Sequence, residues 1–256
     1  MDLLPIQAKS VHEEADGDHD EPETELADTT GPIVVDVRTP EEFAAGHLPN
    51  AINIPHEKVV GELAKRGIAK DAPLVFLKGP NSLLGHRGYT PRPVDAAFMH
   101  YECELAIVVG QTARRVKKAD AYDFIAGYTV ANDYAIRDYL ENYYRPNLRV
   151  KNRDGCTVLG PWFVPVAEVP NPHDLALRTR VNGVVTQQGH TADLISDIPA
   201  LIAYLSGFMT LQPGDVILTG TPDGVVNVNA GDEVVTEIDG IGRLVNTIVG
   251  DDIFGR

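Results

Sequence analysis

The chain has 256 residues, a length that fits one large domain or two small ones. Its formal net charge of −15 argues against a nucleic-acid partner and against anionic membrane surfaces, because both carry negative charge. No apolar run approaches the roughly 20 residues of a membrane-spanning helix, and the two cysteines fit reduced thiols better than a disulfide framework, so we expect a cytoplasmic protein.

The first segment, residues 1–31, is polar, acidic and without hydrophobic periodicity. Residues 1–30 hold ten acidic residues and a single base, Lys9. A segment with so much charge and so few apolar residues cannot bury enough surface to offset the entropy that folding removes. We therefore expect a disordered acidic tail, and an interaction tail is the alternative that this composition leaves open.

Residues 32–77 have the alternating pattern of a small parallel α/β unit. Strands are expected at 32–38, 50–55 and 72–77, with helices at 39–47 and 56–67. The stretch VVDVRTPEEFAAGHLPNAINIP resembles the first half of a rhodanese-like sulfurtransferase domain. That family carries a nucleophilic cysteine after the next strand, where this chain has Leu77 and Lys78. Without a thiolate there is no persulfide to carry, so we predict a truncated and catalytically empty rhodanese-like segment.

From about residue 73 the sequence becomes rich in short strands separated by Gly- and Pro-containing turns. Strands are expected at 104–110, 175–187, 215–222 and 232–249, helices at 118–130 and 197–208, and hairpin turns at 181–183 and 238–242. Asp197 is placed to cap the second helix ahead of Pro199. We therefore predict an α+β, mostly β domain over residues 78–256, preceded by the small α/β segment.

The stretch HYECELAIVVG indicates a buried strand that opens with two glutamates. Glu102 and Glu104 point to the same face of a strand, because side chains alternate, whereas Cys103 points to the other face. Like charges this close repel unless a cation lies between them. Asp133 follows a second apolar strand and supplies a third carboxylate, and three hard oxygen ligands favour Mg²⁺ or Mn²⁺. Salt bridges from these acids to Arg137 and Lys151 are the alternative, and spacing alone leaves both open.

Several motifs indicate one enzyme family: LVFLKGPNSLLG, HYECELAIVVG, AGYTVANDYAIRD, VKNRDGCTVLGPW, LQPGDVILTGTPDGV and GDEVVTEIDGIGRLVN. Over residues 73–256 the chain resembles the fumarylacetoacetate hydrolase family, and within it the branch that serves homoprotocatechuate (4-hydroxyphenylacetate) breakdown. The resemblance implies a mixed β-roll, usually assembled as a homodimer. It also implies a small-molecule 2-oxo carboxylate as substrate and a divalent metal ion, Mg²⁺ or Mn²⁺, as cofactor.

The same resemblance implies roles for the charged residues. The metal ligands would be Glu102, Glu104 and Asp133. Lys151 would be the active-site lysine near the substrate, and Arg137 would support the loop that carries the metal ligands. For both cations the ordinary alternative is a surface or structural ion pair. The family match favours the catalytic interpretation of Lys151, and it leaves both interpretations of Arg137 open.

The resemblance also implies how the substrate binds and what happens to it. Thr221, with Gly220, would bind a substrate carboxylate through its hydroxyl or a backbone N–H, and a plain turn before Pro222 is the alternative. The expected activity is that of a metal-dependent lyase or isomerase on 2-oxo di- or tricarboxylates. It would decarboxylate 5-oxopent-3-ene-1,2,5-tricarboxylate, tautomerise 2-hydroxyhepta-2,4-diene-1,7-dioate, or do both.

The chain departs from the family pattern ahead of residue 78. Family members of this type carry a His and a Glu on an N-terminal lid over the metal, and the rhodanese-like segment stands in that place. His56 and Glu57 lie there, but their spacing is wrong. Because water activation in the family uses the lid pair, we expect decarboxylation or isomerisation, weakened by its loss. An acylpyruvate or fumarylpyruvate C–C hydrolase and a non-catalytic fusion or relic with an interaction role are the alternatives.

Overall fold

The computed structural model describes residues 73, 75–139 and 148–251, and before them the short pieces 35–36, 44 and 52–53. The predicted acidic tail, residues 1–31, and the pair His56 and Glu57 lie outside these described residues. Within the predicted α/β segment, β1 (Val35–Asp36) pairs in parallel with β2 (Ile52–Asn53). These pieces agree with the predicted parallel strands, and most of the remaining segment lies outside what the structure describes.

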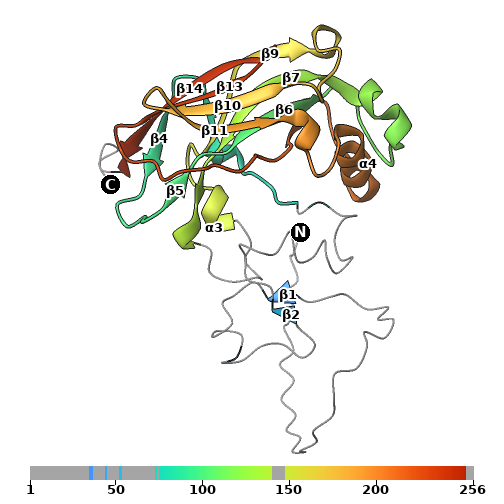
Figure 1. The fold of residues 1–256 in the computed structure, drawn as a ribbon. Coiled ribbons are helices and arrows are strands. Elements are labelled where there is room, and N and C mark those ends of the chain that lie inside the picture. The colour runs from blue at the N-terminus through green and yellow to red at the C-terminus, as the bar shows by residue number, and fades with distance from the viewer. Residues whose placement is uncertain are drawn as a thin grey trace, which may run out of the picture.

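Most of the described strands belong to two five-stranded sheets (Figure 1). The first sheet, in spatial order, contains β11 (Val184–His190), β10 (Ala176–Val181), β13 (Glu233–Ile238), β14 (Gly242–Gly250) and β4 (Tyr89–Arg92). The second contains β12 (Val216–Leu218), β6 (Cys103–Val109), β7 (Ile125–Asp133), β9 (Thr157–Pro165) and β3 (Leu83–Gly85). A short antiparallel pair joins β5 (Met99–His100) to β8 (Ala135–Ile136).

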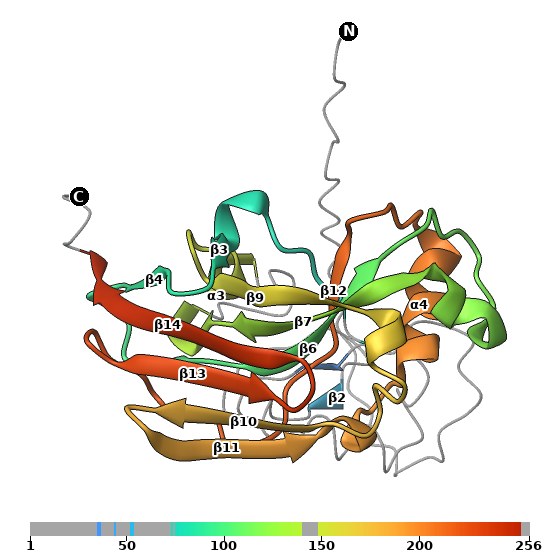
Figure 2. The same ribbon diagram turned by 90° about the horizontal axis from the view of Figure 1, so that it is seen from above.

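Neighbouring strands in the two large sheets are antiparallel except at one edge of each. There β4 pairs in parallel with β14, and β3 pairs in parallel with β9. The sheets pack on each other: β13 and β14 contact β7, and β14 also contacts β9 (Figure 2). Tyr101, Tyr128, Leu105 and Leu244 are among the fully buried side chains of the single large core. The predicted mostly β, α+β fold with mixed sheets is confirmed.

Both predicted hairpin turns form. Asn182 and Gly183 connect β10 to β11 with φ values of 49° and 82°, a pair of positive values that matches the twist of an antiparallel hairpin. Gly240, with φ of 74°, lies in the turn between β13 and β14. These turns set the register of the first sheet and thereby direct the inward-facing residues of β10 and β11.

The predicted helix at 197–208 is also confirmed. The carboxylate of Asp197 accepts the backbone N–H of Ala200 at 2.6 Å, and Pro199 lies in the first turn of α4 (Ile198–Phe208). This helix packs against the 3₁₀ helix η2 (Lys118–Phe124). None of the described helices has both the length and the apolar character needed to cross a lipid bilayer.

The predicted helix at 118–130 is wrong beyond Phe124, because β7 begins at Ile125. This strand lies between β6 and β9 and is buried on both faces, so its apolar run lacks the alternation that would have indicated a strand. The remaining described helices are short: α3 (Leu148–Lys151), η1 (Pro80–Ser82), η3 (Arg137–Tyr139), η4 (Val166–Glu168) and η5 (Thr191–Asp193).

The predicted strand at 72–77 is wrong for the described residues of that stretch. Residues 75–79 have no regular secondary structure. The side chain of Asn152 holds them instead, because its amide donates to the carbonyl of Leu77 at 3.0 Å and accepts the backbone N–H of Gly79 at 2.5 Å. A side-chain clamp therefore replaces a strand ladder, and it fixes the backbone on both sides of Lys78.

Candidate metal and substrate site

Three buried carboxylates meet where β6 begins and β7 ends. Antiparallel pairing places Cys103 opposite Asn132, and the backbone N–H of Asp133 donates to the carbonyl of Glu102 at 3.0 Å. Glu102, Glu104 and Asp133 are only 5%, 4% and 1% exposed. One oxygen from each lies within 4.8 Å of the other two. The three acids that the sequence singled out come together in space, while their role as metal ligands stays a prediction.

The electrostatics of this cluster fit a bound cation. The pKa of Glu104 is raised to about 8, first by burial and then by the negative charges of Glu102 and Asp133. Buried like charges at this separation are costly unless positive charge balances them. Carboxylate oxygens are the ligands that Mg²⁺ and Mn²⁺ prefer. The donor set therefore fits a hard divalent cation held by these three side chains.

Two lysines lie against the carboxylates. Lys151, at the end of α3, donates through Nζ to Glu102 and to Asp133, the latter at 2.9 Å. Burial alone would lower the pKa of Lys151, but the charges of Asp133, Glu102 and Glu104 raise it above its usual value. Lys78 contacts the other oxygen of Asp133 at 2.5 Å and the backbone carbonyl of Lys151. Sequence reasoning gave Lys78 no role; its one signal was its position in the motif LVFLKGPNS.

Arg137 reaches the same cluster from η3. Its guanidinium lies 3.5 Å from Glu102 and donates through Nε to Nε2 of His100 at 2.8 Å. Nδ1 of His100 lies 3.1 Å from the carbonyl of Tyr101, so this nitrogen carries the ring proton. Burial is the main cause that lowers the pKa of His100, which keeps the ring neutral. The salt bridges left open as an alternative, to Arg137 and Lys151, are thus present beside the carboxylate cluster.

Residues 219–224, called the 219–224 loop below, follow β12 and border the cluster. The backbone N–H of Gly220 donates to Glu104 at 2.5 Å, so this group serves the carboxylate rather than an incoming ligand. Thr221 is half-buried beside it, and its hydroxyl accepts a hydrogen bond from Nε2 of Gln187 at 3.0 Å. Thr221 thus directly follows the residue that contacts Glu104, and its binding role stays a prediction. Sequence reasoning missed Gln187 altogether.

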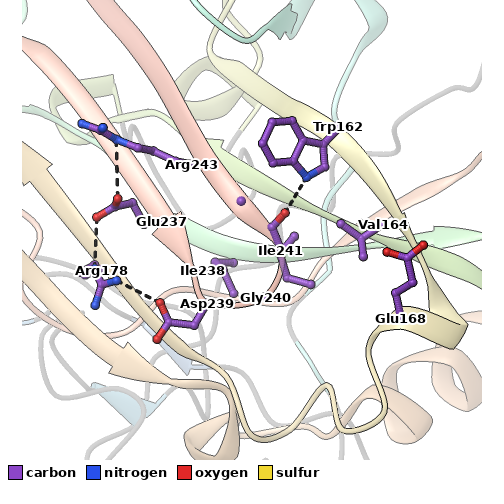
Figure 3. A pocket seen from close by; sticks show the side chains of 11 residues that line it. Trp162, Val164, Glu168, Arg178, Glu237, Ile238, Asp239, Gly240, Ile241 and Arg243 are labelled. Atoms are coloured by element: carbon purple, nitrogen blue, oxygen red, sulfur yellow. Dashed lines mark hydrogen bonds and ion pairs between the residues drawn. The ribbon is translucent and has the colours of Figure 1, made fainter.

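A separate pocket of about 490 Å³ is lined by residues of β9, β10, β13 and β14 (Figure 3). Apart from Glu168, its charged side chains are paired with one another. Arg178 contacts Glu237 at 3.1 Å and Asp239 at 2.9 Å, and Arg243 contacts Glu237 at 3.5 Å. None of the residues assigned to metal, catalysis or substrate lines this pocket. We therefore place the candidate site at the buried carboxylates and not here.

Comparison with known proteins identifies relatives of this chain. The 4-hydroxyphenylacetate degradation bifunctional isomerase/decarboxylase of Salmonella dublin is 63% identical over 177 residues, which make up 69% of this chain and 41% of that protein. The chain therefore spans less than half the length of this relative.

This chain is also similar to solved structures of enzymes. The 5-carboxymethyl-2-hydroxymuconate delta-isomerase of Mycobacterium smegmatis is 42% identical, with a TM-score of 0.68 and 72% of each chain covered. The maleylpyruvate hydrolase of Sphingobium sp. SYK-6, solved in complex with manganese (II) ion and pyruvate, is 36% identical, with a TM-score of 0.63 and coverage of 68% of this chain and 64% of that one.

Two family models match the chain. Residues 20–83 match the rhodanese-like domain, in agreement with the resemblance seen in the sequence. Residues 52–249 match the fumarylacetoacetate (FAA) hydrolase C-terminal model. The two matches overlap between residues 52 and 83, so they leave the predicted boundary at residues 77 and 78 as a prediction. Because the second match covers most of the chain, this protein belongs to the fumarylacetoacetate hydrolase family.

Proposed function

We propose that this protein is a divalent-metal-dependent lyase or isomerase that acts on 2-oxo di- or tricarboxylates of homoprotocatechuate breakdown. One observation carries the proposal: Glu102, Glu104 and Asp133 converge in the core beside a buried lysine and the 219–224 loop. The family and the named activities of its relatives support this reaction class. Decarboxylation of 5-oxopent-3-ene-1,2,5-tricarboxylate and tautomerisation of its 2-hydroxyhepta-2,4-diene-1,7-dioate product are the proposed reactions.

The carboxylate cluster would hold the cofactor, Mg²⁺ or Mn²⁺. A cation bound by Glu102, Glu104 and Asp133 supplies a Lewis acid that stabilises negative charge on a 2-oxo acid. The Mn²⁺ and pyruvate found together in the Sphingobium hydrolase support this choice of metal and ligand class. The backbone N–H of Gly220 keeps Glu104 oriented toward the cluster.

Lys151 is the proposed proton carrier. It is buried and held by Glu102 and Asp133, whose charges raise its pKa in the protein without metal. Loss of CO₂ from a vinylogous β-keto acid leaves the electron pair in a conjugated enolate. The ammonium group of Lys151 then places positive charge near that anion and can return a proton to carbon. Thr221 would hold a substrate carboxylate at the edge of the loop.

Hydrolysis of a C–C bond is the less favoured reaction. It needs a general base for water, and His100 is the described histidine recorded in contact with the carboxylate cluster. His100 lies 3.8 Å from Glu102, but both of its ring nitrogens have polar partners and its pKa is lowered. Decarboxylation and tautomerisation need no activated water, so they fit the described residues better.

The test uses the full chain purified without added metal. Mn²⁺ or Mg²⁺ should raise the melting temperature and start the loss of absorbance of 5-oxopent-3-ene-1,2,5-tricarboxylate, and Glu102→Ala should abolish both effects. Hydrolysis of maleylpyruvate or fumarylpyruvate without decarboxylation would instead assign the protein to the hydrolases. Metal binding with no turnover of any of these substrates would support a non-catalytic relic and overturn the proposal.

A further inference from the structure

Gln187 on β11 is hydrogen-bonded to the 219–224 loop. It is 2% exposed. Its amide nitrogen donates to the hydroxyl of Thr221 at 3.0 Å and to the carbonyl of Pro222 at 2.7 Å. Its amide oxygen accepts the hydroxyl of Thr179, from the neighbouring strand β10, at 3.0 Å. Both N–H groups and the oxygen of this buried amide are therefore hydrogen-bonded.

The partners of Gln187 fix which way its amide points. The carbonyl of Pro222 can only accept a hydrogen bond, so the group that faces it must be the NH₂. The same NH₂ faces Thr221, whose hydroxyl oxygen is thus an acceptor toward Gln187. A hydroxyl that accepts from one side keeps its own proton for another partner. Gln187 therefore leaves the hydroxyl proton of Thr221 for an acceptor other than itself.

Thr221 consequently offers two donors one residue away from the Gly220 that contacts Glu104. Among the residues that the structure describes, neither its hydroxyl proton nor its backbone N–H has a protein acceptor. The neighbouring N–H of Gly220 already binds Glu104. Two free donors on a half-buried residue match an anionic oxygen better than a neutral group.

β11 contains a β-bulge next to the residue that contacts the loop. The register shifts between Thr179, which faces Gln187, and Arg180, which faces Val185, so Thr186 is an extra residue on β11. The hydroxyl of Thr186 accepts from the hydroxyl of Tyr101 at 2.6 Å, while its neighbour Gln187 contacts the loop. Successive side chains of a regular strand point to opposite faces, and a bulge removes this constraint.

We propose that Gln187 is a positioning residue that directs the hydroxyl of Thr221 toward a carboxylate of the substrate. The proposal rests on the proposed function, because it concerns how the same site selects its anion. It predicts that replacing Gln187 lowers the affinity for a 2-oxo acid. Metal binding by the carboxylate cluster should not change.

The test compares Gln187→Met with Gln188→Met in the full chain. Methionine keeps the length of the side chain but has no donor, and Gln188 is an exposed neighbour on the same strand. With Mn²⁺ saturating, calorimetry should show about tenfold weaker pyruvate binding for Gln187→Met. The KM for the proposed substrate should rise by about the same factor, with kcat changed less than about twofold. Gln188→Met should match the wild type in all three measurements.

Two further variants keep the test decisive. Gln187→Glu should bind pyruvate more weakly than Gln187→Met, because a carboxylate would accept the Thr221 proton and repel the anion. Should both position-187 variants fail to fold, Thr179→Val removes the donor to the amide oxygen of Gln187, and it should also weaken pyruvate binding.

The outcomes separate this proposal from the proposed function. A wild-type protein that binds neither Mn²⁺ nor pyruvate overturns the proposed function. A wild type that binds both, with Gln187→Met binding pyruvate equally well, overturns only the role of Gln187. Equal losses of Mn²⁺ and pyruvate affinity in Gln187→Met would assign the residue a general structural role and would also overturn it.

Discussion

Two clusters of charge in this protein differ in where they lie and in how they are balanced. On the first sheet, Glu237 contacts three cations at 3.1 to 3.5 Å: Arg178, Arg180 and Arg243. These arginines are more than a third exposed. In the buried cluster, two lysines and the half-exposed Arg137 contact three carboxylates. Cations are in excess at the surface, whereas the buried carboxylates outnumber the two lysines that lie among them.

The difference explains why one cluster is a candidate site and the other is not. Water screens the surface arginines, so no further partner is needed there. Closely spaced carboxylates in the core have little water to screen them, and burial together with the charges of Glu102 and Asp133 raises the pKa of Glu104. A bound divalent cation would remove this cost. Replacing one cation in each environment with methionine tests this comparison.

The largest effect is expected for Lys151→Met. The substitution leaves Glu102 and Asp133 buried without their ammonium partner, so the free energy of unfolding should fall by about 3 to 5 kcal/mol. Urea denaturation without metal measures this loss. Added Mn²⁺ should restore much of the lost stability, because a bound cation also neutralises the carboxylates. A loss that Mn²⁺ leaves unchanged would argue against a metal site here, and turnover should fall at least about 100-fold in either case.

An intermediate effect is expected for Arg137→Met. Its side chain is 48% exposed, but it contacts buried Glu102 at 3.5 Å and donates to His100. Solvent screens part of this interaction, so we expect a loss of about 1 kcal/mol in the same denaturation experiment. A loss as large as that of Lys151→Met would mean that Arg137 is as essential to the charge balance as the lysine, and the ranking by burial would be wrong.

The smallest effect is expected for Arg178→Met. Its partners Glu237 and Asp239 are at the surface, and Arg243 remains beside Glu237. The free energy of unfolding should change by less than about 1 kcal/mol. Mn²⁺ should raise the melting temperature of this variant as much as that of the wild type. A marked loss of metal response would show that the two clusters are coupled, contrary to the comparison drawn above.

The sequence predicted the parts of the site that depend on local spacing. Glu102 and Glu104 are two residues apart on a strand, so their common face follows from the alternation of side chains. The hairpin turns and the cap at Asp197 likewise depend on a few neighbouring residues. The sequence also offered Asp133 as a third carboxylate, but no spacing rule gives its convergence with the pair, and the catalytic interpretation of Lys151 came from the family resemblance.

The contacts that sequence reasoning missed join residues far apart along the chain. Lys78 reaches Asp133 across 55 residues, and Gln187 reaches Thr221 across 34. Each depends on an irregular feature, the clamp at Asn152 for Lys78 and the bulge at Thr186 for Gln187. The failed helix beyond Phe124 has a related cause, because burial on both faces of β7 comes from strands elsewhere in the chain.

The edges of the two sheets limit where a different N-terminal segment could be joined to this fold. Residues 83–92 supply β3 to the edge of one sheet and β4 to the edge of the other. Just upstream, Lys78 is the first described residue that contacts the carboxylate cluster. A module grafted before residue 78 leaves both edges and this contact in place, whereas a junction inside 83–92 would open both sheets at once. The two sheet edges and the Lys78 contact together lead us to expect that a module can be exchanged only ahead of Lys78.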